Sequence, residues 1–202
     1  MKLYYYPGAS STAPHIVACE AGIALELEKV DLGSKRTATG EDYLAVNPKG
    51  YVPALRLDDG SVLTEVSAII QYLADRAPSS GLLPAAGTME HYRALEWIGY
   101  VATEIHKGFG PLWNARLAPE ARAAAVAALA HRLDLVEKVL ASRPFVLGPS
   151  FSAVDAYLFT VASWAPWVKL DLAPWPAIRD FLARVAARPG VQEALAAEGL
   201  NE

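Results

Sequence analysis

The sequence predicts an α/β domain with a mixed sheet at the N-terminus, followed by a domain built only of helices. Three observations support this prediction. Residues 1–78 show strand and helix patterns in the order βαβ and then ββα. Residues 79–88 are rich in proline, glycine and serine, which is typical of a linker. Residues 89–202 show only helical periodicity, so we expect the second domain to be all-α.

The first domain is expected to begin with a short aromatic strand. Residues 3–6 read Leu-Tyr-Tyr-Tyr and are stopped by a Pro-Gly pair. A helix should follow, because residues 10–12 offer N-cap hydroxyls, Pro14 suits a first helical turn and Gly22 suits the stop. Residues 25–32 then alternate leucine with glutamate at their start, which is the pattern of a half-exposed strand.

A hairpin and a helix complete the first domain. Residues 54–57 and 62–63 flank an Asp-Asp-Gly turn and predict two antiparallel strands. Residues 66–76 have a helical period, with isoleucine and leucine on one side and polar residues on the other. Together these elements predict a four-stranded mixed sheet with helices, like that of thioredoxin.

Helices account for the whole of the second domain. We expect them over residues 90–107, 120–141, 156–162 and 177–187, with a further short one restarted by Pro189. Ser152 and Asp155 form a variant of the capping box, with Asp in place of Glu or Gln, before the apolar third helix. Asp155 is therefore expected to support folding rather than chemistry.

Composition argues against several classes of protein. The chain is 53% hydrophobic and 20% charged, as in ordinary globular proteins. Its net charge of -4 and the lack of a Lys/Arg run argue against nucleic acid as a partner. No apolar run reaches the length of a membrane span, and the start does not read as a signal peptide. We therefore expect a cytoplasmic protein with no membrane partner.

Cys19 is the single cysteine, so neither an intrachain disulfide nor a cysteine metal cluster can form. No other ligand spacing in the sequence indicates a metal. Cys19 lies inside the first expected helix without a basic neighbour, and it is expected to be a small apolar side chain rather than a nucleophile. His15, in the same helix, is expected to be structural.

Two neighbouring signals indicate a ligand site. Val52 precedes Pro53 at the end of a loop, and its backbone N–H and C=O could pair with an extended peptide. Thr64 and Glu65 lead from a strand into a helix start at Val66, where unpaired N–H groups and the helix dipole favour a carboxylate. The two signals together predict a site for a small anionic peptide.

The chain resembles the cytosolic glutathione transferases over its full length, and most closely the bacterial beta class. Six blocks match in the right order and spacing: residues 1–9, 47–53, 63–65, 68–74, 102–110 and 152–159. The resemblance implies a homodimer that binds glutathione as co-substrate and conjugates it, as a thiolate, to small electrophiles that are mostly apolar. No metal is implied.

The resemblance also implies individual contacts to glutathione. A cis bond before Pro53 would aim the Val52 backbone at the cysteinyl part, and Lys35 would pair with the glycyl carboxylate. Glu65 would face the γ-glutamyl ammonium, and the Val66 N–H would face the adjacent carboxylate. The implied glutathione-binding residues are Tyr5, Ser10, Lys35, Tyr51, Val52, Pro53, Glu65, Val66, Ser67, Thr103, Glu104, His106 and Lys107.

This chain departs from the beta class at three positions. Ser10 stands where these enzymes typically carry cysteine, so a mixed disulfide with glutathione cannot form there and glutaredoxin-like exchange should be missing. Val66 replaces a serine of many transferases, and the next residue, Ser67, could supply the hydroxyl instead. Gly99 replaces an asparagine of close relatives, so that ligand contact should be absent.

A serine can still activate the thiol, because a hydroxyl that donates to a thiolate lowers its pKa. Ser10 ranks first as the donor, Ser11 second and Tyr5 third, while either serine could instead serve as an N-cap. His106 offers a proton carrier and Lys107 a positive charge, and both could lower the thiol pKa.

Two further interpretations remain open at the level of sequence. A non-catalytic protein of the same fold could bind glutathione or an apolar ligand. A specialised transferase, such as a dehalogenase or an isomerase of a dienoic acid, would share the same motifs.

Overall fold

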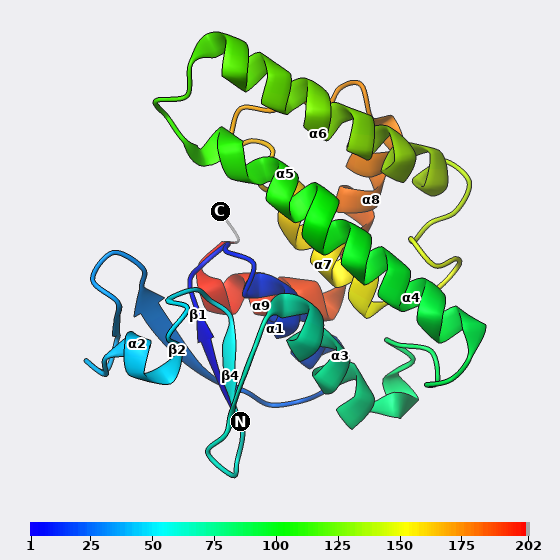
Figure 1. Ribbon diagram of the computed structural model, residues 1–202. Helices are drawn as coiled ribbons and strands as arrows, with labels where there is room; N and C mark the ends of the chain where they lie inside the picture. The colour runs from blue at the N-terminus through cyan, green and yellow to red at the C-terminus, as the bar shows by residue number, and fades with distance from the viewer. Residues whose placement is uncertain (201–202) are drawn as a thin grey trace. The chain divides into compact units, whose positions relative to one another are not determined.

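The computed structural model describes residues 1–200 (Figure 1). It contains one mixed sheet, in the strand order β3-β2-β1-β4-β5. β1 pairs with β2 in parallel and with β4 in antiparallel, and the outer pairs β2–β3 and β4–β5 are antiparallel. The strands are β1 (Lys2–Tyr5), β2 (Glu26–Asp31), β3 (Arg36–Thr37), β4 (Ala54–Arg56) and β5 (Val62–Thr64). This arrangement is the expected thioredoxin-like sheet, with one strand more.

The prediction of four strands is wrong, because β3 adds a fifth as an outermost strand next to β2. β3 is only two residues long and lies in a polar stretch, so it carries no alternating pattern that sequence analysis could detect. Its pairing is local: Val30 of β2 faces Thr37, and the N–H of Ala38 donates to the carbonyl of Lys29 at 2.8 Å.

Two compact units divide the chain differently from the expected domains. Met1–Leu83 and the described residues from Ala187 onward form the first unit, and Pro84–Ala186 form the second. The sequence predicts a single domain over residues 89–202, of which 201–202 lie outside the described residues. The difference arises because the last helix packs on the first one, and Arg188 donates to Glu20 at 3.0 Å.

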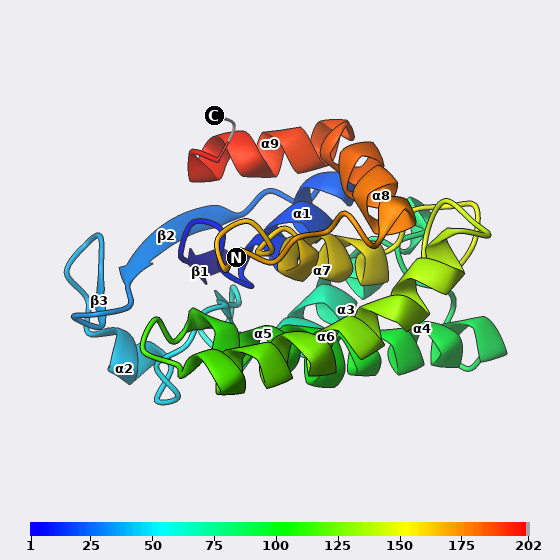
Figure 2. The ribbon, with the colours of Figure 1, turned by 90° about the horizontal axis from the view of Figure 1, so that it is seen from above.

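Helices of the first unit pack side by side. α1 lies between α3 and α9 and contacts both (Figures 1 and 2). The buried face of α3 carries apolar residues at helical spacing, as the sequence predicts. The helices are α1 (Thr12–Glu20), α2 (Tyr43–Val46), α3 (Val66–Arg76), the short 3-10 turn η1 (Pro78–Ser80) and α9 (Pro189–Glu198).

The second unit is all-helical, with α7 at its centre. Every residue of α7 is buried, and α7 contacts η2, α4 and α8. The elements are α4 (Met89–Tyr100), the π-helical segment η2 (Val101–His106), α5 (Lys107–Phe109), the 3-10 segment η3 (Gly110–Trp113), α6 (Pro119–Leu140), α7 (Ala153–Ala162) and α8 (Pro176–Ala186). None of the helices within residues 1–200 has the length and apolar character needed to cross a membrane.

A buried carboxylate caps α7, as the sequence predicts. Asp155 accepts hydrogen bonds from the Ser152 hydroxyl at 2.6 Å and from the N–H groups of Ser152 and Val146 at 2.9 and 2.8 Å. Asp155 is fully buried, and this burial raises its pKa from 3.8 to about 6, although the three hydrogen bonds favour the charged form.

Asp155 should therefore make stability fall as pH rises through the acid range. Between pH 3.8 and about 6 the folded state binds more protons at this group than the unfolded state does, so its contribution decreases across that window and is constant above it. We expect the free energy of unfolding, relative to Asp155→Asn, to drop by roughly 1–3 kcal/mol from pH 4 to pH 7. Urea unfolding of both proteins across pH measures this difference, and parallel pH curves would contradict it.

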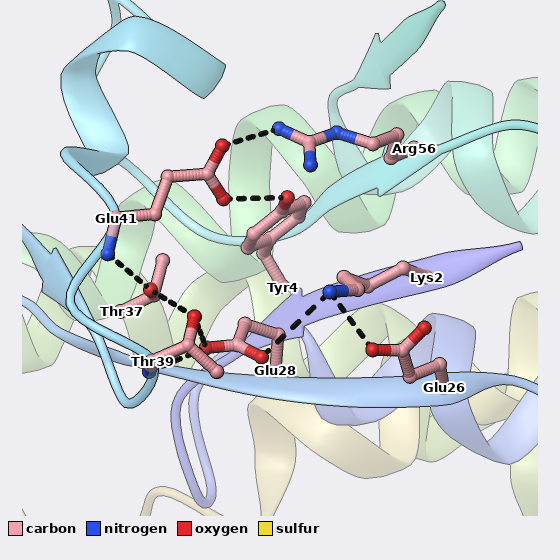
Figure 3. Close-up of polar contacts among 8 residues, drawn as sticks. All are labelled: Lys2, Tyr4, Glu26, Glu28, Thr37, Thr39, Glu41 and Arg56. Atoms are coloured by element: carbon pink, nitrogen blue, oxygen red, sulfur yellow. Dashed lines mark hydrogen bonds and ion pairs between the residues drawn. The ribbon is translucent and has the colours of Figure 1, made fainter. Parts of the chain in front are cut away.

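A polar network fixes the loop between β3 and α2 against the sheet (Figure 3). Arg56 of β4 and Tyr4 of β1 donate to the two oxygens of Glu41, at 2.7 and 3.1 Å. Thr39 donates through its N–H and its hydroxyl to the buried Glu28 of β2, both at 2.9 Å. The Arg56 guanidinium lowers the pKa of Glu41. Burial opposes a low pKa at Glu28, but the Thr39 hydrogen bonds outweigh it and lower that pKa as well.

Candidate functional site

Three strand ends meet at one edge of the sheet. Tyr4, next to the end of β1, pairs with Ala54 at the start of β4. Ala54 pairs in turn with Thr64, the last residue of β5. This register places Val52 and Pro53 between the β1–α1 loop and the β5–α3 junction. The two ligand signals of the sequence therefore belong to one edge of the sheet.

The Val52–Pro53 bond is cis, as the resemblance implies. The loop before it is tied down at one carbonyl, because Tyr51 O accepts from the Tyr43 hydroxyl at 2.6 Å and from Asn47 Nδ2 at 2.7 Å. The Tyr51 side chain is 73% exposed, while Val52 is buried. The Val52 backbone is thus held at a fixed place, which pairing with an extended peptide requires.

Ser10 and Ser11 differ in what their hydroxyls bind. Ser10 Oγ donates to Val52 O over 3.3 Å, which is long for a hydroxyl hydrogen bond. Ser11 Oγ accepts from the Tyr6 N–H at 3.1 Å and donates to Tyr6 O at 3.2 Å. Ser11 occupies the N-cap position of α1, yet its side chain does not cap the helix. Its hydroxyl closes the turn after β1, and Ser10 keeps the weaker bond.

Tyr5 and Lys35 are two further predicted site residues in the same unit as these serines. Tyr5 is half-buried, and burial followed by the charges of Glu198 and Glu28 raises its pKa, so its phenol stays neutral. Lys35 has a left-handed backbone with φ 56° and donates through Nζ to Gly50 O at 2.9 Å. Its ammonium therefore lies beside the loop that leads to Val52.

The β5–α3 junction has an unusual backbone. Glu65 has φ 73° and ψ 126°, a conformation that non-glycine residues rarely adopt and that is often found at binding sites. Its carbonyl accepts from the N–H groups of Ala68 and Ile69, at 3.1 and 3.0 Å. The N–H groups of Val66 and Ser67 therefore precede the first hydrogen-bonded turn, where a carboxylate is favoured.

A buried carboxylate that sequence analysis missed lies against the β1–α1 loop. Glu198 of α9 accepts from the Gly8 N–H at 3.0 Å and from Thr12 Oγ1 at 2.8 Å, and it contacts His15 Nδ1 at 2.9 Å. Its side chain is 0% exposed, and His15 is buried in the structural role expected of it. The sequence carries no signal for Glu198, because a glutamate in an Ala-rich helix normally faces solvent.

The other predicted site residues lie on the second unit, in η2 and at the start of α5. Thr103 is exposed and donates to Gly99 O at 3.0 Å, and Lys107 is exposed. Glu104 accepts from Arg132 Nε of α6 at 2.8 Å. Single π-helical turns inside helices are frequent at functional sites, and this one holds three of the four predicted residues.

His106 belongs to an aromatic cluster within the second unit. Its Nδ1 lies 2.7 Å from the Tyr157 hydroxyl, and its ring centroid is 4.9 Å from that of Trp164. Trp113 stacks edge-on against Trp164 and touches Trp167. Trp113 and Trp167 are 48% and 53% exposed, so this cluster offers apolar surface beside His106.

The structure gives Cys19 no activated thiol. Burial, followed by the charges of Glu193 and Glu20, raises the pKa of the half-buried Cys19 thiol to about 11, which leaves it protonated at neutral pH. Within residues 1–200, no group of three His, Cys, Asp or Glu side chains is placed to hold a metal ion.

The chain combines a thioredoxin-like unit, with a cis-proline at the edge of its sheet, and an all-helical unit. Comparison with known proteins identifies the class of two-domain proteins to which this combination belongs. Residues 10–76 match the N-terminal domain of glutathione S-transferases, and residues 100–189 match the C-terminal domain. The chain belongs to the glutathione S-transferase family.

Relatives cover the whole chain. It is 48% identical to glutathione S-transferase GstA of Escherichia coli O157:H7 over 201 residues, which is 100% of both chains. It is also similar to a sphingomonad glutathione S-transferase solved in complex with glutathione, with 45% identity and a TM-score of 0.95. The bacterial beta-class enzyme of Sphingomonas chungbukensis has 42% identity and a TM-score of 0.94. Both structural matches cover 99% of this chain and 100% of the other.

Proposed function

We propose that the protein binds glutathione at this sheet edge, activates it as a thiolate and conjugates it to electrophilic, mostly apolar substrates. The observation that carries the proposal is the Ser10 hydroxyl, which reaches the carbonyl of Val52 next to the cis bond of Pro53. A full-length relative named a glutathione S-transferase supports the reaction class. A non-catalytic binding protein is therefore not favoured.

Activation means loss of the thiol proton. A cysteine thiol has a pKa of about 8.5, so only a few per cent is ionised at neutral pH, and a shift of about 2 units ionises most of it. Ser10 can supply this shift when its hydroxyl turns from Val52 O to the sulfur. The proton passes to solvent, the thiolate donates its electron pair to the electrophilic carbon, and the leaving group departs with its bonding pair.

The charges at the sheet edge match those of glutathione. The Val52 backbone pairs with the cysteinyl part, and Lys35 faces the glycyl carboxylate. Glu65 faces the γ-glutamyl ammonium, and the N–H groups of Val66 and Ser67 face the adjacent carboxylate. Opposite charges and the dipole of α3 support these assignments.

Residues of the second unit complete the proposal. On the resemblance, we assign His106 the role of a proton carrier, Lys107 that of a positive charge, and Thr103 and Glu104 that of ligand contacts. The half-exposed tryptophans near His106 offer a surface for an apolar electrophile. Membership of the beta class, a homodimeric state and a cytoplasmic location stay predictions from the sequence.

Calorimetric titration with glutathione across pH, with thiolate absorbance and turnover of an aryl halide on the same samples, tests the proposal. We expect binding, a thiolate at neutral pH and measurable conjugation. Binding without thiolate or turnover would support the non-catalytic interpretation. No binding at all would overturn the proposed function and leave the fold unaffected.

A further inference from the structure

Lys49 lies where a cationic group of a ligand would meet Glu65. Lys49 Nζ is 2.6 Å from Glu65 Oε1 and 3.0 Å from Thr64 Oγ1. A carboxylate and a hydroxyl that converge on one ammonium are the acceptors that any primary ammonium needs. In the proposed function, the same carboxylate serves the γ-glutamyl ammonium. The Lys49 ammonium and the ligand ammonium therefore share the Glu65 carboxylate as an acceptor.

The loop that carries Lys49 is fixed, but the ion pair is open to water. The Lys49 N–H donates to Asn47 Oδ1 at 3.1 Å, and Asn47 is itself buried and bonded to Tyr51 O at 2.7 Å. The side chains of Lys49 and Glu65 are 51% and 64% exposed. Ion pairs this exposed are weak, so an incoming ammonium can displace the lysine without disturbing the loop.

We propose that Lys49 is an internal competitor for the ammonium subsite. In the free protein its ammonium occupies Glu65, and it leaves when a ligand ammonium arrives. This inference rests on the proposed function. The other lysine of the region, Lys35, donates to Gly50 O instead. Lys49 thus tunes affinity for ligands that carry an ammonium group, and it has no such effect on ligands that lack one.

The test compares two ligands by calorimetry at low salt. One is glutathione, and the other is glutaryl-cysteinyl-glycine, in which hydrogen replaces the γ-glutamyl amino group. Lys49→Met removes the competing charge and keeps an unbranched stem, and Lys49→Arg keeps the charge. Lys29→Met is the matched control, because Lys29 is an exposed lysine of β2 in the same unit.

We expect Lys49→Met to bind glutathione about two- to fivefold more tightly than the wild type, the range that an exposed ion pair allows. Its affinity for the desamino analogue should stay unchanged, and Lys49→Arg and Lys29→Met should match the wild type with both ligands. A structural effect on the loop would change both ligands alike, whereas competition strengthens the binding of glutathione alone.

Two results would overturn the inference while the proposed function stands. Weaker binding of both ligands to Lys49→Met would make Lys49 a carboxylate ligand or a support of the loop. Unchanged binding of both would show that the ion pair does not compete. If the wild type itself fails to bind glutathione, the proposed function fails, and the inference falls with it.

Discussion

Ser10→Ala is expected to lower kcat/KM for glutathione conjugation by about ten- to a hundredfold. A hydrogen bond to a charged group contributes about 1.5–3 kcal/mol, and each 1.36 kcal/mol is a factor of ten in rate. Loss of the donor should also raise the pKa of the bound thiol by about one to two units. The thiolate is the reactive form. The rise with pH of kcat/KM for the electrophile, measured at saturating glutathione, should therefore move to higher pH by the same amount. Steady-state kinetics across pH and thiolate absorbance measure both effects.

Two control variants separate Ser10 from the other candidate donors. The Ser11 hydroxyl is bound to both backbone groups of Tyr6, so Ser11→Ala should cost stability by about 1 kcal/mol and leave the pH profile in place. Tyr5→Phe removes the phenol donor alone and should not move the profile either. An unshifted profile in Ser10→Ala together with a shift in Tyr5→Phe would assign the donor role to Tyr5.

Features that depend on neighbouring residues could be predicted from the sequence. The aromatic strand, the hairpin around the Asp-Asp-Gly turn and the capping box of Ser152 and Asp155 all appear where expected, because turn chemistry and capping act over a few residues. The cis bond before Pro53 needed more than local chemistry. Most bonds before proline are trans, and only the resemblance to a known family indicated the rarer form.

Features that depend on distant residues could not be predicted. β3 is a strand because β2 lies beside it, and α9 joins the first unit because its buried face fits α1. Helical periodicity shows that a helix forms, but it does not show which partner the helix covers. The two adjacent serines have the same local chemistry, and only the resemblance to a known family ranks Ser10 first. The carbonyls of Val52 and Tyr6, which the fold brings to them, make them different.

Glu198→Ala is expected to lower the free energy of unfolding by about 3 kcal/mol. Removal of the carboxylate leaves the Gly8 N–H and the Thr12 hydroxyl without this acceptor, and each buried donor left unsatisfied costs about 1–3 kcal/mol. The His15 ring loses its contact as well. Relief of the buried charge offsets part of this loss. Urea unfolding at neutral pH gives the difference directly.

Helix propensity cannot explain such a loss, because alanine is the best helix former and Glu198 ends a helix rich in alanine. Glu193→Ala on the same helix is the control: Glu193 is exposed, and its replacement should change stability by no more than about 0.5 kcal/mol. If both variants unfold alike, the Glu198 contacts do not stabilise the fold. If Glu198→Ala alone is destabilised, the carboxylate holds Gly8 and Thr12 on either side of Ser10. The serine that we propose as thiolate donor would then depend on the last helix of the chain for its position.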